Sequence, residues 1–188
     1  MVSTRRSSAR LRLCDASALA KVLVTGSADG VLQKAWGVGF RSSTQRDGAL
    51  VVGSGPGEWL LLGAPGAARQ LTEQVRSQAG EEFVTTVDVT HGRALMRLTG
   101  DDAARMLSKV CAVDVSNAVT PDRAAFRTSV AKVSTDVVRD DLGAGGSAPS
   151  YLLHCERSSG QYLFDCLLDA GKEFGIEPAG SNLDGKDA

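Results

Sequence analysis

The feature that most constrains the fold is a pair of short apolar runs separated by a glycine-rich turn. The run ALVV at 49–52 and the run WLLL at 59–62 lie on either side of the sequence GSGPG. Short apolar runs bounded by Gly and Pro are typical of buried strands. Two such runs around a tight turn pair as a β-hairpin. We therefore expect an antiparallel sheet at this point of the chain.

The glycine spacing at 53–57 is also compatible with a phosphate-binding loop. Such a loop opens a helix after a strand, so that backbone amides and the helix dipole face the phosphate. Here a second β-type run follows instead, and Pro56 removes one amide donor. No Gly-Lys-Ser/Thr sequence is present either. We interpret this segment as a hairpin turn.

Four other segments have the apolar spacing of three and four residues that predicts helices. The clearest spans residues 67–80, where the apolar residues share one face and Gly80 is typical of a helix C-terminus. The residues expected to be buried on that face are Ala68, Leu71, Val75 and Ala79. The other three predicted helices lie at 31–36, 101–110 and 158–175.

The remaining apolar segments are short and predict strands. They are the segment that ends before Gly26, the two segments on either side of His91-Gly92, and residues near 125–133, 136–139 and 151–156. Hairpin-joined strands interspersed with helices indicate an α+β fold. We expect antiparallel sheets with helices on one side and ferredoxin-like strand–helix units.

The chain of 188 residues is long enough for one domain. Four arginines and no acid precede Asp15, so we expect a flexible basic arm at 1–13. The globular part is expected at 14–176, as one unit or as two small lobes of about 14–90 and 91–176. The glycine-rich segment 141–149 is expected to be a flexible loop, and residues 177–188 a mobile tail.

Charge and composition exclude several classes of function. The chain has 21 basic and 22 acidic residues, so its formal charge of −1 gives no field for nucleic acid or an anionic membrane. No apolar run is long enough for a transmembrane helix. The four cysteines form no CxxC pair, which argues against zinc and favours reduced thiols in the cytoplasm. We expect no metal and no cofactor in this chain.

The sequence signals no catalytic residue. His91 lies between Asp88 and Arg93 and could act as a general base, but no nucleophile is indicated to join it. A turn histidine bonded to the backbone is the simpler interpretation. His154 lies in an apolar strand and is expected to be a partly buried core residue, and the aspartates at 101 and 102 are expected to cap a helix.

Several motifs together resemble the gamma subunit of bacterial heterotetrameric sarcosine oxidase. The family's G-P-x-E-W-L-L-L is matched at 55–62, and its D-V-S-H-G-R at 88–93, with Thr90 in place of serine. Its R-S-x-x-x-Y-L and the leucine-rich helix that follows correspond to residues 157–168. The sequence LTGDDAARML at 98–107 is similar to the aminomethyltransferase (glycine cleavage T-protein) superfamily. The resemblance covers about residues 16–174.

This resemblance implies a T-protein-like fold, shared with folate-binding proteins, and a role in an enzyme complex. The complex of alpha, beta, gamma and delta subunits oxidises sarcosine or a related N-methyl amine to glycine. It yields hydrogen peroxide and formaldehyde or 5,10-methylenetetrahydrofolate. The resemblance implies that FAD, FMN, NAD, zinc and tetrahydrofolate belong to partner subunits. The gamma subunit is similar to a noncatalytic structural component.

Four residues are the interface candidates of this hypothesis: Glu58, Trp59, His91 and Arg93. Trp59 could anchor a subunit interface or the protein's own core, since buried aromatics are common in both. The alternative function is a stand-alone folate-binding aminomethyltransferase-like protein. A third hypothesis is a small binding module in which His91 and Arg93 hold an anion.

Overall fold

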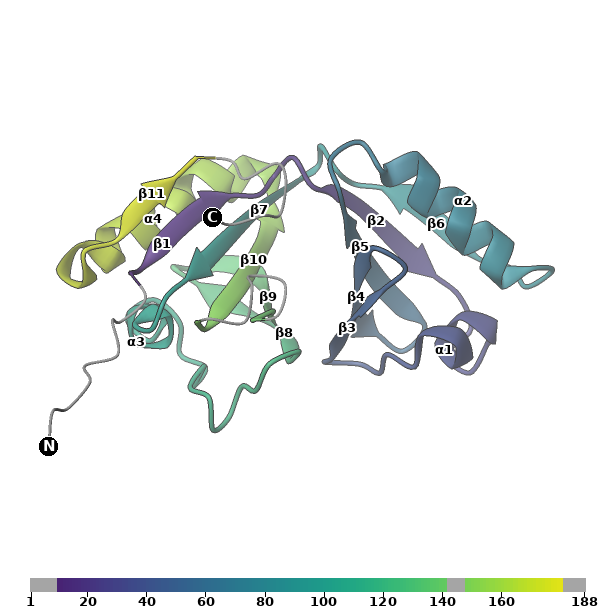
Figure 1. Ribbon diagram of the computed structural model, residues 1–188, viewed down its shortest axis with the longest axis horizontal. Coiled ribbons are helices and arrows are strands. Elements are labelled where there is room, and N and C mark those ends of the chain that lie inside the picture. Colours follow the sequence, from purple (N-terminus) through teal and green to yellow (C-terminus); the bar gives the residue numbers. More distant parts are fainter. Residues whose placement is uncertain (1–9, 142–147, 181–188) are drawn as a thin grey trace, which may run out of the picture.

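The computed structural model describes residues 10–141 and 148–180. Most of the predicted basic arm, most of the 141–149 loop and the last eight residues of the predicted tail lie outside these ranges. Two sheets form the described part of the molecule, in the strand orders β11-β1-β7-β10-β9-β8 and β3-β4-β5-β2-β6. Figure 1 shows the two sheets as separate lobes with their helices on the outside.

The six-stranded sheet and its helices form the first lobe. Its strands are β1 (Arg12–Asp15), β7 (Arg93–Thr99), β8 (Ala125–Val130), β9 (Val133–Arg139), β10 (Ser150–Glu156) and β11 (Glu177–Ala179). Its helices are α3 (Ala103–Leu107) and α4 (Gly160–Gly171), the latter flanked by the short 3-10 helices η2 (Arg157–Ser159) and η3 (Lys172–Phe174). The strand pairs are antiparallel, except that β11 pairs parallel with β1.

The five-stranded sheet and its helices form the second lobe. Its strands are β2 (Ala20–Thr25), β3 (Ser43–Arg46), β4 (Ala49–Gly55), β5 (Glu58–Gly63) and β6 (Thr85–Asp88). Its helices are α1 (Val31–Trp36) and α2 (Ala68–Ala79). All strand pairs in this sheet are antiparallel. The predicted α+β class, with antiparallel sheets and helices on one side of each, is confirmed.

Strand β5 shows why its sequence is almost continuously apolar. Alternate side chains of a strand point to opposite faces of the sheet. Trp59 and Leu61 pack in the core under the helices of the second lobe, whereas Leu60 and Leu62 pack in a third cluster that joins the two lobes. Both faces of this strand are therefore buried. The helices cover the outer face of each sheet, and the two inner faces, which no helix covers, approach each other.

The predicted hairpin at 49–62 is confirmed. β4 and β5 pair in register from Leu50–Leu62 onward, with an irregularity between Gly53 and Gly55. Gly57 has φ of 71°, and a Cβ atom there would lie 2.4 Å from the Gly26 carbonyl oxygen. This glycine is needed for the turn and for close packing against the β2–α1 connection, so the segment is not a phosphate-binding loop.

The chain passes between the lobes twice, at 16–19 and at 89–92. Lys21 joins these two passages, because its buried ammonium donates hydrogen bonds to the carbonyl oxygens of Ser17, Leu19 and Thr90 at 2.7, 2.9 and 3.2 Å. The strands predicted on either side of His91-Gly92 exist as β6 and β7. They belong to different sheets, so the break between them is a passage between lobes.

Both ends of the described chain are more ordered than the sequence indicated. Leu13, at the end of the predicted arm, is fully buried in β1. Residues 177–179, at the start of the predicted tail, form β11 beside it. Leu11 and Leu13 supply an apolar face on which this added edge can form, which corrects the predicted boundaries at 13 and 177.

The helix predicted at 101–110 is shorter than expected. α3 has five residues, and no side chain caps its N-terminus. Asp102 instead pairs with Arg105 at 2.7 Å.

Within the described residues, no helix is long and apolar enough to cross a membrane.

Candidate functional site

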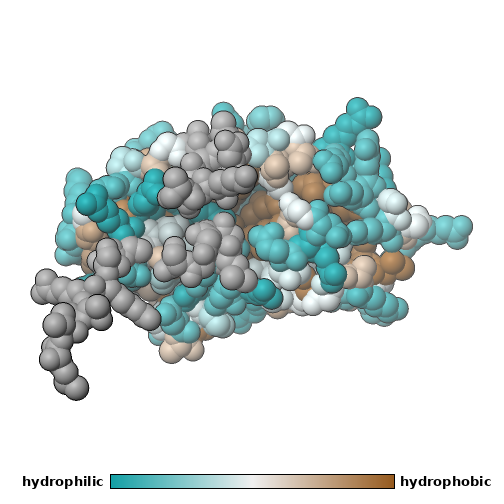
Figure 2. All heavy atoms as spheres, in the orientation of Figure 1, coloured by the Kyte–Doolittle hydropathy of each residue, from teal (hydrophilic) through white to brown (hydrophobic). Residues whose placement is uncertain are grey.

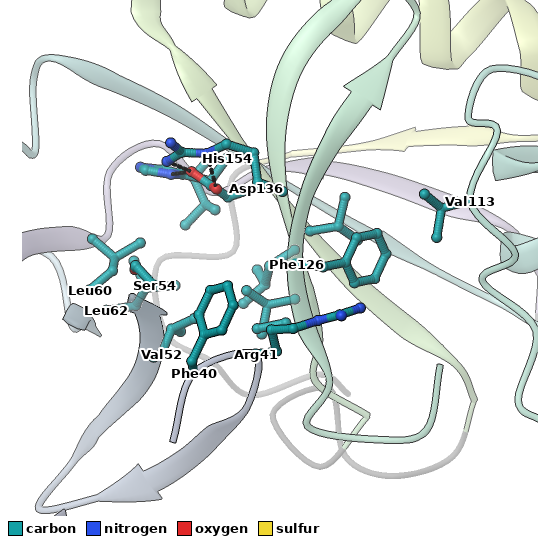
Figure 3. Close-up of a pocket in the computed structure, with 17 residues that line it drawn as sticks. Phe40, Arg41, Val52, Ser54, Leu60, Leu62, Val113, Phe126, Asp136 and His154 are labelled. Atoms are coloured by element: carbon teal, nitrogen blue, oxygen red, sulfur yellow. Dashed lines mark hydrogen bonds and ion pairs between the residues drawn. The ribbon is translucent and has the colours of Figure 1, made fainter. Parts of the chain in front are cut away.

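The two bare sheet faces enclose a cavity of about 480 Å³. Its lining is mostly apolar and comes from both lobes, with polar groups at its ends (Figure 3). Figure 2 shows apolar residues between the lobes, on a face that is otherwise mostly hydrophilic. The lining residues that matter below are Phe40, Arg41, Phe126, Arg127, Asp136 and His154. A volume of this size is typical of small-molecule sites.

The polar end of the cavity is a row of side chains on neighbouring strands. Strand register places Leu95, His154, Asp136 and Arg127 side by side on β7, β10, β9 and β8. Residues opposite each other in adjacent antiparallel strands share a face and come within contact distance. All four therefore lie on the sheet face that is turned toward the second lobe.

Asp136 is the centre of this row. Arg127 donates two hydrogen bonds to its carboxylate, from Nε at 2.7 Å and from Nη2 at 3.0 Å. His154 Nδ1 lies 3.4 Å from Asp136 Oδ2. Burial by itself would raise the pKa of Asp136, but the hydrogen bonds and charges of His154 and Arg127 outweigh it and lower the pKa to about 2. The carboxylate is therefore ionised at neutral pH.

His154 has one ring nitrogen that is not satisfied. The residue is 3% exposed, and its Nε2 is buried with no hydrogen-bond partner among the described residues. Because the ionised Asp136 accepts from Nδ1–H, Nε2 is the ring nitrogen that is left for another group. Buried polar atoms usually have partners, so this nitrogen can form a hydrogen bond with a bound group.

A second hollow of about 210 Å³ adjoins the polar end of the cavity. Three of the predicted interface candidates, Glu58, Trp59 and Arg93, line it together with Arg127, Asp136 and His154. Arg93 pairs with Glu156 at 2.5 Å, so its guanidinium is already neutralised. The structure thus brings Glu58 and Arg93 together at one end of the space between the lobes.

Trp59 lies in the core of the second lobe. It is 1% exposed, its Nε1 donates a hydrogen bond to the Val38 carbonyl at 3.3 Å, and its ring meets Trp36 edge-on at a centroid distance of 5.2 Å. Of the two roles that the sequence left open, the structure gives this side chain the core role. It has no surface to offer a partner.

His91 lies apart from the cavity, in the exposed passage between β6 and β7. Its carbonyl accepts a hydrogen bond from Arg157 Nη1 at 3.4 Å. The Asp88 carboxylate is occupied by the Thr90 amide at 2.9 Å, and Arg93 is occupied by Glu156. Of the predicted anion-holding pair of His91 and Arg93, the guanidinium is therefore already paired with a carboxylate.

The described residues contain no cluster of His, Cys, Asp or Glu that could hold a metal ion. The cysteines are all free thiols. The row of Arg127, Asp136 and His154 is the part of the site that the sequence analysis missed. The sequence does show these three residues as polar positions within apolar strands. Whether they lie side by side depends on the register of the strands, which the sequence pattern did not specify.

The chain belongs to the GCVT N-terminal domain family, whose model matches residues 4–183. The search of curated proteins found no match. Among solved structures, a chain of the heterotetrameric sarcosine oxidase from Corynebacterium sp. U-96, in complex with pyrrole 2-carboxylate, is similar with a TM-score of 0.74 and 21% identity. The match covers 90% of this chain and 87% of that chain.

The glycine cleavage system aminomethyltransferase T from Bartonella henselae is also similar, with a TM-score of 0.68 and 16% identity. That match covers 91% of this chain and 48% of the other, so this chain spans about half the length of the aminomethyltransferase. At these identities the likeness establishes a shared fold. The predicted resemblance to both proteins is confirmed at that level.

Proposed function

We propose that this protein is a noncatalytic structural subunit of a sarcosine oxidase-type complex. In this proposal its partners are alpha, beta and delta subunits, which hold the FAD, FMN, NAD and zinc and oxidise sarcosine or a related N-methyl amine. The observation that carries the proposal is coverage: the likeness to a chain of a heterotetrameric sarcosine oxidase runs over most of both chains. The likeness to the aminomethyltransferase ends halfway along that enzyme.

The chemistry of the interlobe site supports a role without catalysis. Asp136 keeps its negative charge at neutral pH and shares it between Arg127 and His154, so it is a poor proton donor and a weak base. Among the described residues, no hydroxyl or thiol is hydrogen-bonded to His154 as an activated nucleophile would be.

Co-expression with the three partner subunits of a sarcosine oxidase tests the proposal. A tag on the alpha subunit is used to isolate the complex, and the eluate is analysed for this chain. We expect the chain to co-purify in a fixed ratio to alpha and to be absent from the eluate when alpha carries no tag. Recovery of the three partners as a complete, active complex without this chain would contradict the proposal.

The cavity favours a second candidate, a stand-alone folate-binding protein of aminomethyltransferase type. The space of about 480 Å³ is apolar along its walls and has an ionised carboxylate at one end. Calorimetric titration of the isolated chain with tetrahydrofolate decides it. Saturable binding that Asp136→Asn weakens would favour this candidate. No heat of binding at high concentrations of the chain and of tetrahydrofolate would eliminate it.

A further inference from the structure

Besides the Lys21 junction and the apolar cluster between the sheets, the lobes are joined by backbone hydrogen bonds at a place that we call the clasp (residues 41–43 and 123–125). Ser42 and Ala124 form an isolated antiparallel bridge between the lobes. The Ala125 amide donates to the Arg41 carbonyl at 3.0 Å, and the Ser43 amide donates to the Arg123 carbonyl at 2.8 Å. The clasp lies beside the cavity, since Arg41 and Ala125 also line it.

Two arginines of the clasp have a backbone conformation that arginine rarely adopts. Arg41 has φ of 70° and Arg123 has φ of 72°. The other described non-glycine residues with positive φ are Asp47, Ala131 and Lys132, which lie in the short turns between β3 and β4 and between β8 and β9. Hairpin turns require that conformation, whereas the clasp is no hairpin. Glycine or asparagine would adopt it with less strain.

The side chains of these arginines make no contact that explains the strain. Both residues are exposed, and neither guanidinium has a hydrogen-bond or ion-pair partner among the described residues. The nearest acid in sequence, Asp122, accepts a hydrogen bond from the Asp141 amide at 2.8 Å. Exposed unpaired cations are ordinary, but two of them at strained backbone positions favour a role outside the chain.

An exposed aromatic side chain adjoins the first of these arginines. Phe40 is 60% exposed and lies at the cavity rim beside Arg41, whose side chain extends toward Phe126 (Figure 3). Val113, which is 37% exposed, lies on the same rim. Aromatic side chains and arginine are the residues that dominate the energetics of protein interfaces.

We propose that Phe40, Arg41 and Arg123 form a docking surface for a carboxylate-rich segment of a partner protein that also carries an apolar side chain. This inference rests on the proposed function and names the chemistry of the partner. Two unpaired guanidinium groups select an acidic partner, and Phe40 needs an apolar side chain against it, which a small anion lacks. A second copy of this chain would bring like charges together.

The test uses the double variant Arg41→Asn and Arg123→Asn. Asparagine removes the charge and also relieves the positive φ, so loss of binding is separated from loss of folding. Lys132→Asn is the matched control, because Lys132 is also an exposed cation with positive φ (67°), but it lies in the β8–β9 turn. Affinity for the co-expressed partner subunits is measured at two salt concentrations, together with melting temperature.

We expect the double variant to melt at the same temperature as the wild type or higher, and to bind the partners at least about tenfold more weakly with a smaller salt dependence. The Lys132 control should bind like the wild type. Equal binding by the double variant would overturn the docking surface while the proposed function stands. A double variant that melts lower would show that the arginines are structural, which also overturns it.

A second measurement covers the case in which the wild type binds no partner, so that the proposed function itself fails. A fluorescein-labelled peptide of glutamates around one phenylalanine is titrated into the isolated chain. Saturable, salt-sensitive binding that the double variant loses would support the surface. No binding, or complete displacement by inorganic phosphate at low concentration, would overturn it.

Discussion

Asp136 is the one carboxylate among the described residues that line the interlobe cavity. Its carboxylate is held between a bidentate guanidinium and an imidazole, and this pairing lowers its pKa to about 2 from an ordinary value of 3.8. A carboxyl group whose pKa is lower in the folded state stabilises the protein at pH values above its unfolded pKa. That contribution is lost as the pH falls from the unfolded pKa toward 2, because the carboxyl group is then protonated first in the unfolded and finally also in the folded protein.

The first prediction concerns this pH dependence. Asp136→Asn should lower the free energy of unfolding by about 2 kcal/mol at pH 6, which corresponds to the pKa difference. The difference between wild type and variant should shrink between about pH 4 and pH 2. Urea unfolding at several pH values measures it. If the difference in unfolding free energy stayed constant down to pH 2, the stabilisation would not come from the ionised form of the Asp136 carboxylate.

Trp59 allows a second prediction at the residue scale. Because its ring is buried against Trp36, Trp59→Ala should cost about 3–5 kcal/mol of unfolding free energy. Trp59→Phe, which keeps most of the packing, should cost clearly less. Chemical denaturation of both variants measures the costs. A loss below about 1 kcal/mol for alanine would contradict the core role and return this residue to the interface candidates.

Among the elements, the β4–β5 hairpin and α2 were predictable because their signals are local. Gly and Pro mark the turn at 55–57, and the buried face of α2 consists of the four residues that its spacing predicted. α3 was predicted too long, because the apolar spacing continues to Val110 while the backbone leaves the helix after Leu107. β9 begins at Val133, earlier than expected, because the turn lies at Ala131 and Lys132.

The turn of this hairpin gives the third prediction. Gly57→Ala should cost at least about 2 kcal/mol, because a Cβ atom at this position meets the Gly26 carbonyl and alanine resists the positive φ. Gly37→Ala is the matched control: φ is also positive (64°), but the added methyl group meets no atom within 4 Å. It should cost about 1 kcal/mol. Thermal or urea unfolding compares them, and equal costs would refute the role of close packing.

At the scale of the whole molecule, the structure is a pair of sheets held at a junction and at a clasp, with the cavity between them. The sequence analysis reached the class of fold but left open whether the globular part is one unit or two lobes. It could not place Arg127, Asp136 and His154 together, because they lie on three strands and meet only through the register of those strands. It also assigned His154 to the core, where only one of its ring nitrogens finds a partner.

Lys21 gives the fourth prediction, since it ties both passages between the lobes. Lys21→Met keeps the length of the side chain but leaves three carbonyl groups without their donor, and should cost about 3 kcal/mol or more. Arg10→Met, which removes an exposed cation paired with Glu177, should cost less than about 1 kcal/mol. Urea unfolding measures both, and a loss for Lys21→Met no larger than that of the control would contradict the junction.

The central claim is that this chain acts as a structural part of a flavoenzyme complex and has no turnover of its own. Native mass spectrometry of the chain co-expressed with its alpha, beta and delta partners tests it most directly, with a sarcosine turnover assay on the same samples. We expect one active assembly that contains a single copy of this chain. The isolated chain should show no sarcosine turnover and hold no flavin. An isolated chain that oxidises an N-methyl amine or retains flavin would contradict it.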